Sequence, residues 1–191
     1  MQNNTLYLGI DIGSTTIKFM LTDGEKELFS CYERHFSRVR EKTVELLERA
    51  HGVAREAYPG SEPTICAAIS GSAGLGLAEA AGMPFVQEVF ATAEVVRRKQ
   101  PDASCAIELG GEDAKIIFFT GGLDQRMNGS CAGGTGAFID QMASLLDVSV
   151  SELDLLSLNA SRIYPIASRC GVFAKSDIQP LINQGARKED I

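Results

Sequence analysis

Two cysteines stand among small residues at points where helices are expected to begin. Cys131 lies in NGSCAGGTGAF, and Cys170 is followed directly by glycine in CGVFAKSDIQPL. A helix N-terminus carries partial positive charge and free N–H donors, which stabilise a thiolate and favour anionic ligands. Both residues are therefore candidate metal-ligating thiolates.

The residues by themselves leave the ligand of these thiolates open. A zinc site usually takes four ligands, and neither His35 nor His51 has matching spacing, so both histidines are expected at the surface. A [4Fe–4S] cluster takes four cysteine thiolates, of which this chain offers two. A two-fold dimer, or a second copy of the domain in a longer chain, would supply the others. The alternatives are a redox disulfide between Cys131 and Cys170, or two buried structural thiols.

The other three cysteines, Cys31, Cys66 and Cys105, lie in strand-like patterns among apolar residues. They are expected to be small hydrophobic residues of the core. The odd count and the absence of any Cys-x-x-Cys pair argue against a disulfide scaffold of the secreted type.

A glycine-rich turn follows the first strand-like segment, in GIDIGSTTIK. Glycine permits a tight turn and a close approach to a ligand, and hydroxyl and N–H groups in such a turn can hold phosphate oxygens. Asp11, at the strand end, could hold Mg²⁺ through water, and a lysine nearby could add positive charge. The alternative is an ordinary hairpin. The candidate phosphate-binding residues here are Gly13, Ser14, Thr15, Thr16 and Lys18.

A second glycine turn repeats this plan in IELGGEDAK. Glu108 would lie near the metal-bound or attacking water, and the two turns could face each other across a cleft that holds a nucleotide. A plain hairpin is again the alternative. A P-loop is excluded, because no Gly-x-x-x-x-Gly-Lys-Ser/Thr pattern occurs. The segment GSAGLG has its glycines in the wrong order for a dinucleotide fingerprint and is expected to be a loop. The candidate phosphate-binding residues of the second turn are Gly110, Gly111, Glu112 and Asp113.

Alternating strands and helices must position these residues. An antiparallel meander is expected over 6–36, because Asp23-Gly24 is a hairpin signal. A helix over 39–58 has Val44, Leu47 and Ala54 near helical spacing. Further strands are expected at 64–70, where TICAAIS reads as buried, and in three runs within 105–129. Further helices are expected at 77–82, 87–101, 134–146, 149–158 and 170–185, the last bent or ended by Pro180.

Composition narrows the class of protein. The 191 residues are 45% hydrophobic and carry a net charge of −7. The acidic balance argues against non-specific binding to nucleic acid or to an anionic membrane. With no signal peptide and no apolar run long enough to span a bilayer, a cytoplasmic protein is expected.

The two turns resemble those of the acetate kinase, sugar kinase and actin superfamily. Together with NGSCAGGTGAFIDQMA and ASRCGVFAKSDIQPLI, they resemble more closely the ATP-dependent activators of 2-hydroxyacyl-CoA dehydratases and benzoyl-CoA reductases. The likeness covers essentially the whole chain and is strongest to the N-terminal module of large CoA-substrate-specific enzyme activases.

The resemblance implies an actin-like α/β ATPase fold, with a mixed sheet flanked by helices. It implies a homodimer, or tandem repeat, that holds one [4Fe–4S] cluster through two cysteines per copy, here Cys131 and Cys170. ATP and Mg²⁺ would bind at Asp11, Gly13 to Thr16, Lys18 and the Gly110–Asp113 turn. Nucleotide turnover would change the angle between the helices at the cluster. An electron from a donor such as ferredoxin or flavodoxin would then pass to the dehydratase-type partner.

Two lobes are expected: residues 1–125, with both phosphate turns, and residues 126–191, with the cluster-binding helices and the start of a truncated second lobe. The family's further glycine turn for adenosine does not occur before Ile191. The leading hypothesis is an ATPase that drives electron transfer. The alternatives are a small-molecule kinase of the same superfamily and a non-enzymatic interaction module.

Overall fold

The computed structural model describes residues 5–128, 133–168 and 170–191. The chain divides into two compact units, Met1–Ala103 (unit 1) and Ser104–Ile191 (unit 2), and each is described by itself. The predicted division after residue 125, which keeps both glycine turns in one lobe, stays a prediction.

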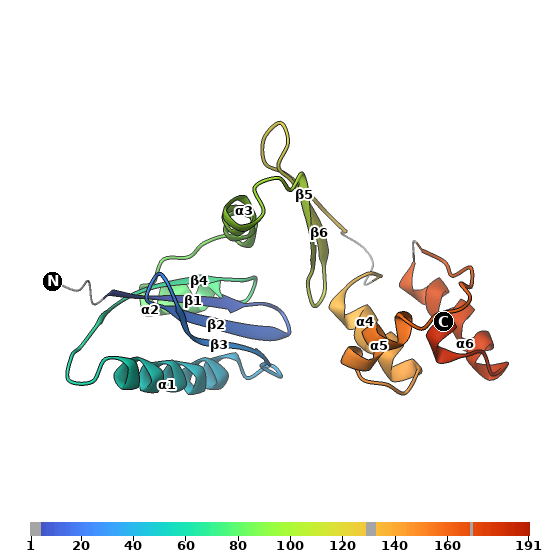
Figure 1. The fold of residues 1–191 in the computed structure, drawn as a ribbon, viewed down its shortest axis with the longest axis horizontal. Helices are drawn as coiled ribbons and strands as arrows, with labels where there is room; N and C mark the ends of the chain where they lie inside the picture. The colour runs from blue at the N-terminus through green and yellow to red at the C-terminus, as the bar shows by residue number, and fades with distance from the viewer. Residues whose placement is uncertain (1–4, 129–132, 169) are drawn as a thin grey trace. The chain divides into compact units, whose positions relative to one another are not determined.

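Unit 1 is built on a mixed four-stranded sheet in the order β3-β2-β1-β4 (Figure 1). The central strand β1 pairs antiparallel with β2 and parallel with β4, and β3 pairs antiparallel with β2. The predicted meander is therefore confirmed. The strands are β1 (Thr5–Ile12), β2 (Thr16–Thr22), β3 (Glu27–Arg34) and β4 (Thr64–Ser70).

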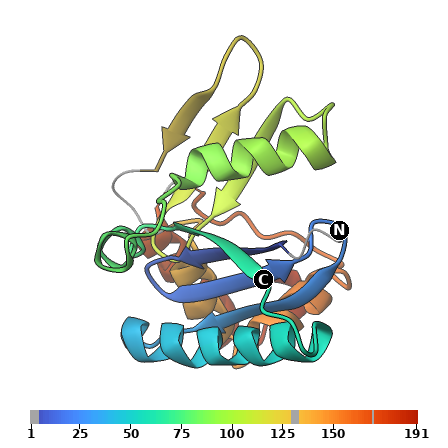
Figure 2. The same cartoon turned by 90° about the vertical axis from the view of Figure 1, so that its left-hand side faces the viewer.

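The helices of unit 1 lie on the two faces of this sheet. Figures 1 and 2 show α1 along one face and α3 on the opposite side. Helix α1 packs on β2 and β3, and α2 packs on β4. The helices are α1 (Val39–Ala57), α2 (Leu75–Ala81) and α3 (Glu88–Lys99).

The core of unit 1 lies between α1 and the sheet. Every second residue of β1, from Leu6 to Ile12, is buried there, as strand alternation requires. The buried residues of α1 are Thr43, Leu46, Ala50 and Ala54. The predicted apolar face was therefore wrong by about one position at Val44, which is 54% exposed. Leu46 is the large side chain on this buried face, together with the smaller residues Thr43, Ala50 and Ala54, whereas Leu47 is only partly buried.

Strand β4 is less buried than its apolar sequence suggested. Ile69 is fully buried, but Ile65 is 43% exposed and Cys66 is exposed. The strand stands at the end of the sheet, where one isolated bridge from Ile69 to Phe85 is its further pairing. An edge position explains why a continuous apolar run is not a buried one here.

Unit 2 combines a three-stranded antiparallel sheet, in the order β5-β6-β7, with a helical segment. The predicted capping box of α5 is present, since Ser149 and Glu152 cap each other. Pro180 does not end α6, which continues to Asn183. The elements are β5 (Cys105–Leu109), β6 (Ala114–Phe118), β7 (Asp124–Met127), α4 (Gly136–Leu145), α5 (Val150–Ser157), α6 (Gly171–Asn183) and the 3₁₀ helix η1 (Lys188–Asp190).

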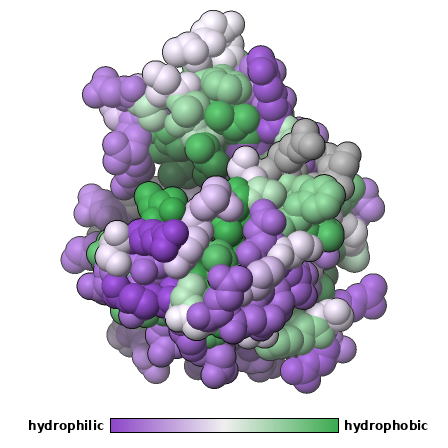
Figure 3. Space-filling model, turned by 90° about the vertical axis from the view of Figure 1, so that its right-hand side faces the viewer, coloured by the Kyte–Doolittle hydropathy of each residue, from purple (hydrophilic) through white to green (hydrophobic). Residues whose placement is uncertain are grey.

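Few large apolar side chains of unit 2 are buried. Ile117, Met142, Leu146 and Ile178 are buried, whereas many others are exposed. Figure 3 shows one face of the molecule on which hydrophobic residues lie among hydrophilic ones. The exposed large apolar residues of the helical part are Val150, Leu155, Leu158, Ile163, Val172 and Phe173.

Replacing Leu46 by alanine is expected to lower the free energy of unfolding by about 2–5 kcal/mol, because the fully buried side chain leaves a cavity under the sheet. The control is Val44→Ala on the exposed side of the same helix, with an expected change below about 0.5 kcal/mol. Urea unfolding followed by circular dichroism measures both. A larger loss of unfolding free energy for Val44→Ala than for Leu46→Ala would contradict the assignment of Leu46 to the buried face of α1.

Candidate functional site

The first glycine turn is flanked by an ion pair across β1 and β2. Asp11 and Lys18 are direct cross-strand partners. Lys18 Nζ lies 2.6 Å from Asp11 Oδ2, and the two side chains are 41% and 32% exposed. The same ammonium group lies 5.3 Å from the centroid of the Tyr32 ring. The lysine therefore neutralises the carboxylate immediately before the turn.

The turn itself leaves backbone donors unused. The N–H of Gly13 donates to Thr16 O at 2.9 Å and closes the loop. The backbone N–H groups of Ser14 and Thr15 donate no hydrogen bond to any residue that the structure describes. Such donors in a tight glycine turn suit an anionic ligand.

The loop after β4 lies against the end of β1. Gly71 has a φ of +97°, and a Cβ placed there would stand 2.1 Å from Ile12 O. Ala73 N–H donates to the same oxygen at 2.9 Å. The predicted loop is confirmed up to Gly74, but α2 begins at Leu75, inside the predicted loop segment. Only glycine fits this approach to the residue before the first glycine turn.

His35 is buried beneath the turn, so the prediction of a surface position was wrong. It is 5% exposed, and its Nε2 lies 3.1 Å from Gly13 O. Its backbone N–H donates to Thr15 O at 3.2 Å. The spacing of His35 relative to possible metal ligands does not indicate this buried position. The register of the meander does, because Arg34 pairs with Thr16 and places the next residue beside the turn. His51 is exposed, as predicted.

The second glycine turn repeats the ion pair of the first. Glu108 and Lys115 are direct cross-strand partners and lie seven residues apart in the sequence, as Asp11 and Lys18 do. Lys115 Nζ lies 3.4 Å from Glu108 Oε1 and 3.3 Å from Asp113 Oδ2. Its side chain is only 8% exposed. Lys115 was not among the predicted site residues, although the spacing that it shares with Lys18 could have identified it.

One oxygen of Glu108 is left unsatisfied. Its Oε2 is buried and has no hydrogen-bond partner in the described part of the chain. A buried carboxylate oxygen without a partner costs free energy, and a water or a cation would remove that cost. Of the remaining predicted residues of this turn, Glu112 is exposed, and Gly111 and Asp113 are half-buried.

The second turn is joined to the first turn of α4. Gly136 N–H donates to Gly110 O at 2.7 Å, and Ala137 N–H donates to Gly111 O at 2.9 Å. Phe138 N–H donates to the hydroxyl of Thr135, which caps the helix and is fully buried. These donors at the start of α4 are therefore occupied, whereas the sequence pattern predicted free donors there.

Of the two predicted cluster ligands, Cys131 lies outside the described residues. Cys170 is a half-buried free thiol at the N-cap of α6, and its side chain makes no capping hydrogen bond. A Cβ on Gly171 would lie 3.1 Å from the Phe138 ring and 3.4 Å from Cα of Gly133. The start of α6 is thus in close contact with α4 and with the residue two positions after Cys131.

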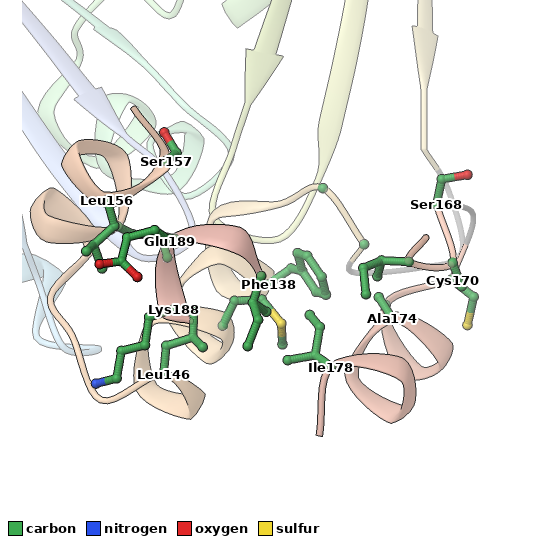
Figure 4. Close-up of a pocket in the computed structure, with 18 residues that line it drawn as sticks. Phe138, Leu146, Leu156, Ser157, Ser168, Cys170, Ala174, Ile178, Lys188 and Glu189 are labelled. Atoms are coloured by element: carbon green, nitrogen blue, oxygen red, sulfur yellow. The ribbon is translucent and has the colours of Figure 1, made fainter. Parts of the chain in front are cut away.

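A cavity of about 500 Å³ lies within unit 2 beside Cys170. It is lined by apolar residues of α4, α5 and α6, with Lys188 and Glu189 also on its wall. Figure 4 shows Phe138 and Ile178 close together in its middle and Cys170 at one side. The cysteine therefore stands where a packed helical core meets the surface.

The remaining cysteines differ from expectation in two of three cases. Cys66 and Cys105 are exposed, so the prediction of core positions was wrong for both. Each points away from the buried face of an edge strand, which alternation permits. Cys31 is half-buried and packs against the core of unit 1, and burial raises the pKa of its thiol.

Two absences hold for the described residues. No group of three or more His, Cys, Asp or Glu side chains there is arranged to hold a metal ion. None of the helices found in the same ranges combines the length and the apolar character needed to cross a bilayer.

Replacing Lys115 by methionine is expected to lower the free energy of unfolding by roughly 2 kcal/mol, because two carboxylates lose their buried cation. The matched control is Lys18→Met in the more exposed pair, with an expected loss under about 1 kcal/mol. Denaturant titration compares them. Equal losses would mean that burial does not distinguish the two pairs.

Proteins with similar sequences include two dehydratase activators. The 2-hydroxyisocaproyl-CoA dehydratase activator of Clostridioides difficile is 28% identical over 187 residues, which cover 96% of this chain and 68% of the relative. The (R)-2-hydroxyglutaryl-CoA dehydratase activating ATPase of Acidaminococcus fermentans is 31% identical over 202 residues, covering 96% and 70%.

Solved structures agree with the sequence relationship. The activator of the 2-hydroxyisocaproyl-CoA dehydratase from Clostridium difficile, with bound ADPNP, matches with a TM-score of 0.81 and 31% identity, over 97% of this chain and 69% of that one. The predicted α/β fold of actin-like ATPases is thereby confirmed. The family model of the BadF/BadG/BcrA/BcrD ATPases matches residues 8–191, and the chain therefore belongs to the BadF/BadG/BcrA/BcrD ATPase family.

Proposed function

We propose that this protein is an ATP-driven electron-transfer activator of a 2-hydroxyacyl-CoA dehydratase-type enzyme, and that two copies share one [4Fe–4S] cluster. The observation that carries the proposal is the direct link between the second glycine turn and α4, made by Gly136 N–H to Gly110 O and Ala137 N–H to Gly111 O. It joins a candidate nucleotide site to the helix that follows Cys131.

Nucleotide binding rests on both turns. In unit 1, the Gly13–Thr16 turn offers backbone donors and hydroxyls to phosphate, beside Asp11 and Lys18. In unit 2, the Gly110–Asp113 turn would contact phosphate from its own side. ADPNP, an ATP analogue, is bound in the matching activator structure. Family membership makes ATP the expected nucleotide.

A Mg²⁺ ion fits the carboxylates at the two strand ends. Glu108 has a buried oxygen without a partner in the described ranges, which a hydrated cation or the attacking water would satisfy. Asp11 lies at the corresponding strand end of unit 1 and is the other carboxylate proposed to hold Mg²⁺ through water. Their lysine partners keep both carboxylates in place when no cation is bound.

A [4Fe–4S] cluster fits the chemistry of Cys170, a thiol at a helix N-terminus with no capping role. Cys131 is the second ligand that this chain would offer. Because one chain offers two thiolates, a second copy would supply the other two around a shared axis. When bound, the cluster would accept one electron and pass it on.

The contacts within unit 2 support a mechanical coupling. A shift of the Gly110–Asp113 turn on nucleotide exchange must move the first turn of α4, because its N–H donors follow the turn's carbonyl oxygens. The start of α6 would follow as well, since Gly171 lies so near α4 that a Cβ there would be 3.1 Å from the Phe138 ring. Nucleotide state would then bias two arrangements of the helices that carry the cysteines.

The partner follows from the relatives, which activate dehydratases of 2-hydroxyacyl-CoA compounds. A reduced donor such as ferredoxin or flavodoxin would supply one electron, which passes to the iron–sulfur centre of the dehydratase. ATP would be hydrolysed to ADP and phosphate to drive the transfer.

Replacing Cys170 by alanine, or Cys131 by alanine, is expected to abolish the iron–sulfur absorbance of protein reconstituted without oxygen, because the cluster loses two of its four ligands in a dimer. Cys66→Ala removes an exposed cysteine and is expected to keep the absorbance and the iron and sulfide content. Retention of the cluster in both ligand variants would refute the assignment.

A further inference from the structure

A buried histidine lies under the first phosphate turn and belongs to neither sequence motif of the proposed site. His35 follows β3 and contacts the turn twice within unit 1. Its ring contacts Gly13 O through Nε2 at 3.1 Å, and its backbone N–H donates to Thr15 O at 3.2 Å. Two of the turn's carbonyl oxygens are therefore held by one residue.

The hydrogen bonds of the ring fix its tautomer. Ser37 N–H donates to His35 Nδ1 at 3.1 Å, so Nδ1 carries a lone pair and the ring proton lies on Nε2. Nε2 therefore donates to Gly13 O. Both ring nitrogens have partners, as a buried imidazole requires.

The segment after His35 is held in a costly conformation. Phe36 and Ser37 have φ angles of 48° and 62°, in the left-handed region that disfavours residues other than glycine. Arg38 N–H donates to His35 O at 2.8 Å and closes this reversal just before α1. The reversal is what brings Ser37 N–H back to the ring, so the strained backbone serves to orient the histidine.

The hydrogen bonds to the carbonyl oxygens of Gly13 and Thr15 also orient the N–H groups of the residues that follow them. In a trans peptide the C=O and N–H groups point in opposite directions. With Gly13 O directed at His35, the N–H of Ser14 points to the other side of the turn. The bond to Thr15 O acts in the same way on the N–H of Thr16. The donors that phosphate would meet are therefore set by groups on the far side of the turn.

We propose that His35 is a positioning residue for the nucleotide phosphates: it acts through Gly13 and does not touch the ligand. The inference rests on the proposed nucleotide site. Preorganised donors bind an anion without the cost of ordering the turn on binding. Loss of the Nε2 donor is therefore expected to weaken nucleotide binding more than its effect on folding would explain.

Two substitutions separate the two ring contacts. His35→Asn keeps an acceptor near the position of Nδ1 but has no donor that reaches Gly13 O. His35→Gln keeps a donor that reaches Gly13 O but loses the acceptor for Ser37 N–H. His51→Asn, at an exposed position of α1, is the control, because it makes the same type of substitution away from the turn.

Calorimetric titration with Mg²⁺ and ADPNP tests the role, with the thermal midpoint of the free protein measured alongside. The dissociation constant is expected to rise about tenfold in His35→Asn, the value of one hydrogen bond, and to stay within about threefold in His35→Gln. If His35 only stabilised the fold, both variants would have lower thermal midpoints, but their affinities for ADPNP would not differ from each other. Equal affinities for wild type and His35→Asn, or equal losses in both variants, would overturn the proposal.

A second measurement uses only the wild-type protein and so does not depend on the folding of a variant. Ring ¹⁵N shifts of His35 in the wild-type protein are expected to report the neutral Nε2–H tautomer with and without ADPNP. The Ser14 amide signal should shift on nucleotide addition. An Nδ1–H or doubly protonated ring would overturn the role of His35 alone. Failure of the wild-type chain to bind ADPNP would instead overturn the nucleotide site, and this role with it.

Discussion

Unit 2 depends on two backbone hydrogen bonds in which the carbonyl oxygens of Gly110 and Gly111 accept the first N–H groups of α4. These two bonds join the helix to the β5–β6 hairpin through backbone groups alone. Gly136 suits this approach, because a Cβ there would lie 3.2 Å from Gly110 O and would require a small shift of the turn. Through α4 the constraint reaches α6, since Gly171 rests on Phe138. The β5–β6 hairpin, the start of α4 and the start of α6 thus lie close together.

The two hairpins solve the same electrostatic problem in different surroundings. Each places a carboxylate at a strand end, a glycine turn after it and a lysine directly across the ladder. In unit 1 the pair is half-exposed and tight, at 2.6 Å. In unit 2 the lysine is buried and shared between Glu108 and Asp113 at longer distances. The looser arrangement leaves one Glu108 oxygen without a partner among the described residues, which makes this carboxylate the better candidate for holding water or a cation.

Periodicity predicted the elements well, because strand alternation and helix caps are local properties. The meander, the capping box at Ser149 and the glycine turns could all be read from neighbouring residues. The predictions that were wrong concern positions whose burial depends on contacts between residues distant in sequence. His35 is buried because β3 ends beside the Gly13 turn, and Cys66 is exposed because its strand stands near the end of a sheet. Counting the register across each hairpin would have recovered His35 and Lys115, whereas edge positions require the sheet order.

The exposed thiols of Cys66 and Cys105 belong to different units, one on β4 and one on β5. With Cys131 and Cys170 replaced by alanine, these exposed thiols offer attachment points for a pair of fluorescent or spin labels, one on each unit. The half-buried Cys31, with its raised pKa, would react more slowly at neutral pH. Labelled in this way, the protein would report any change in the distance between the two labels when nucleotide is added.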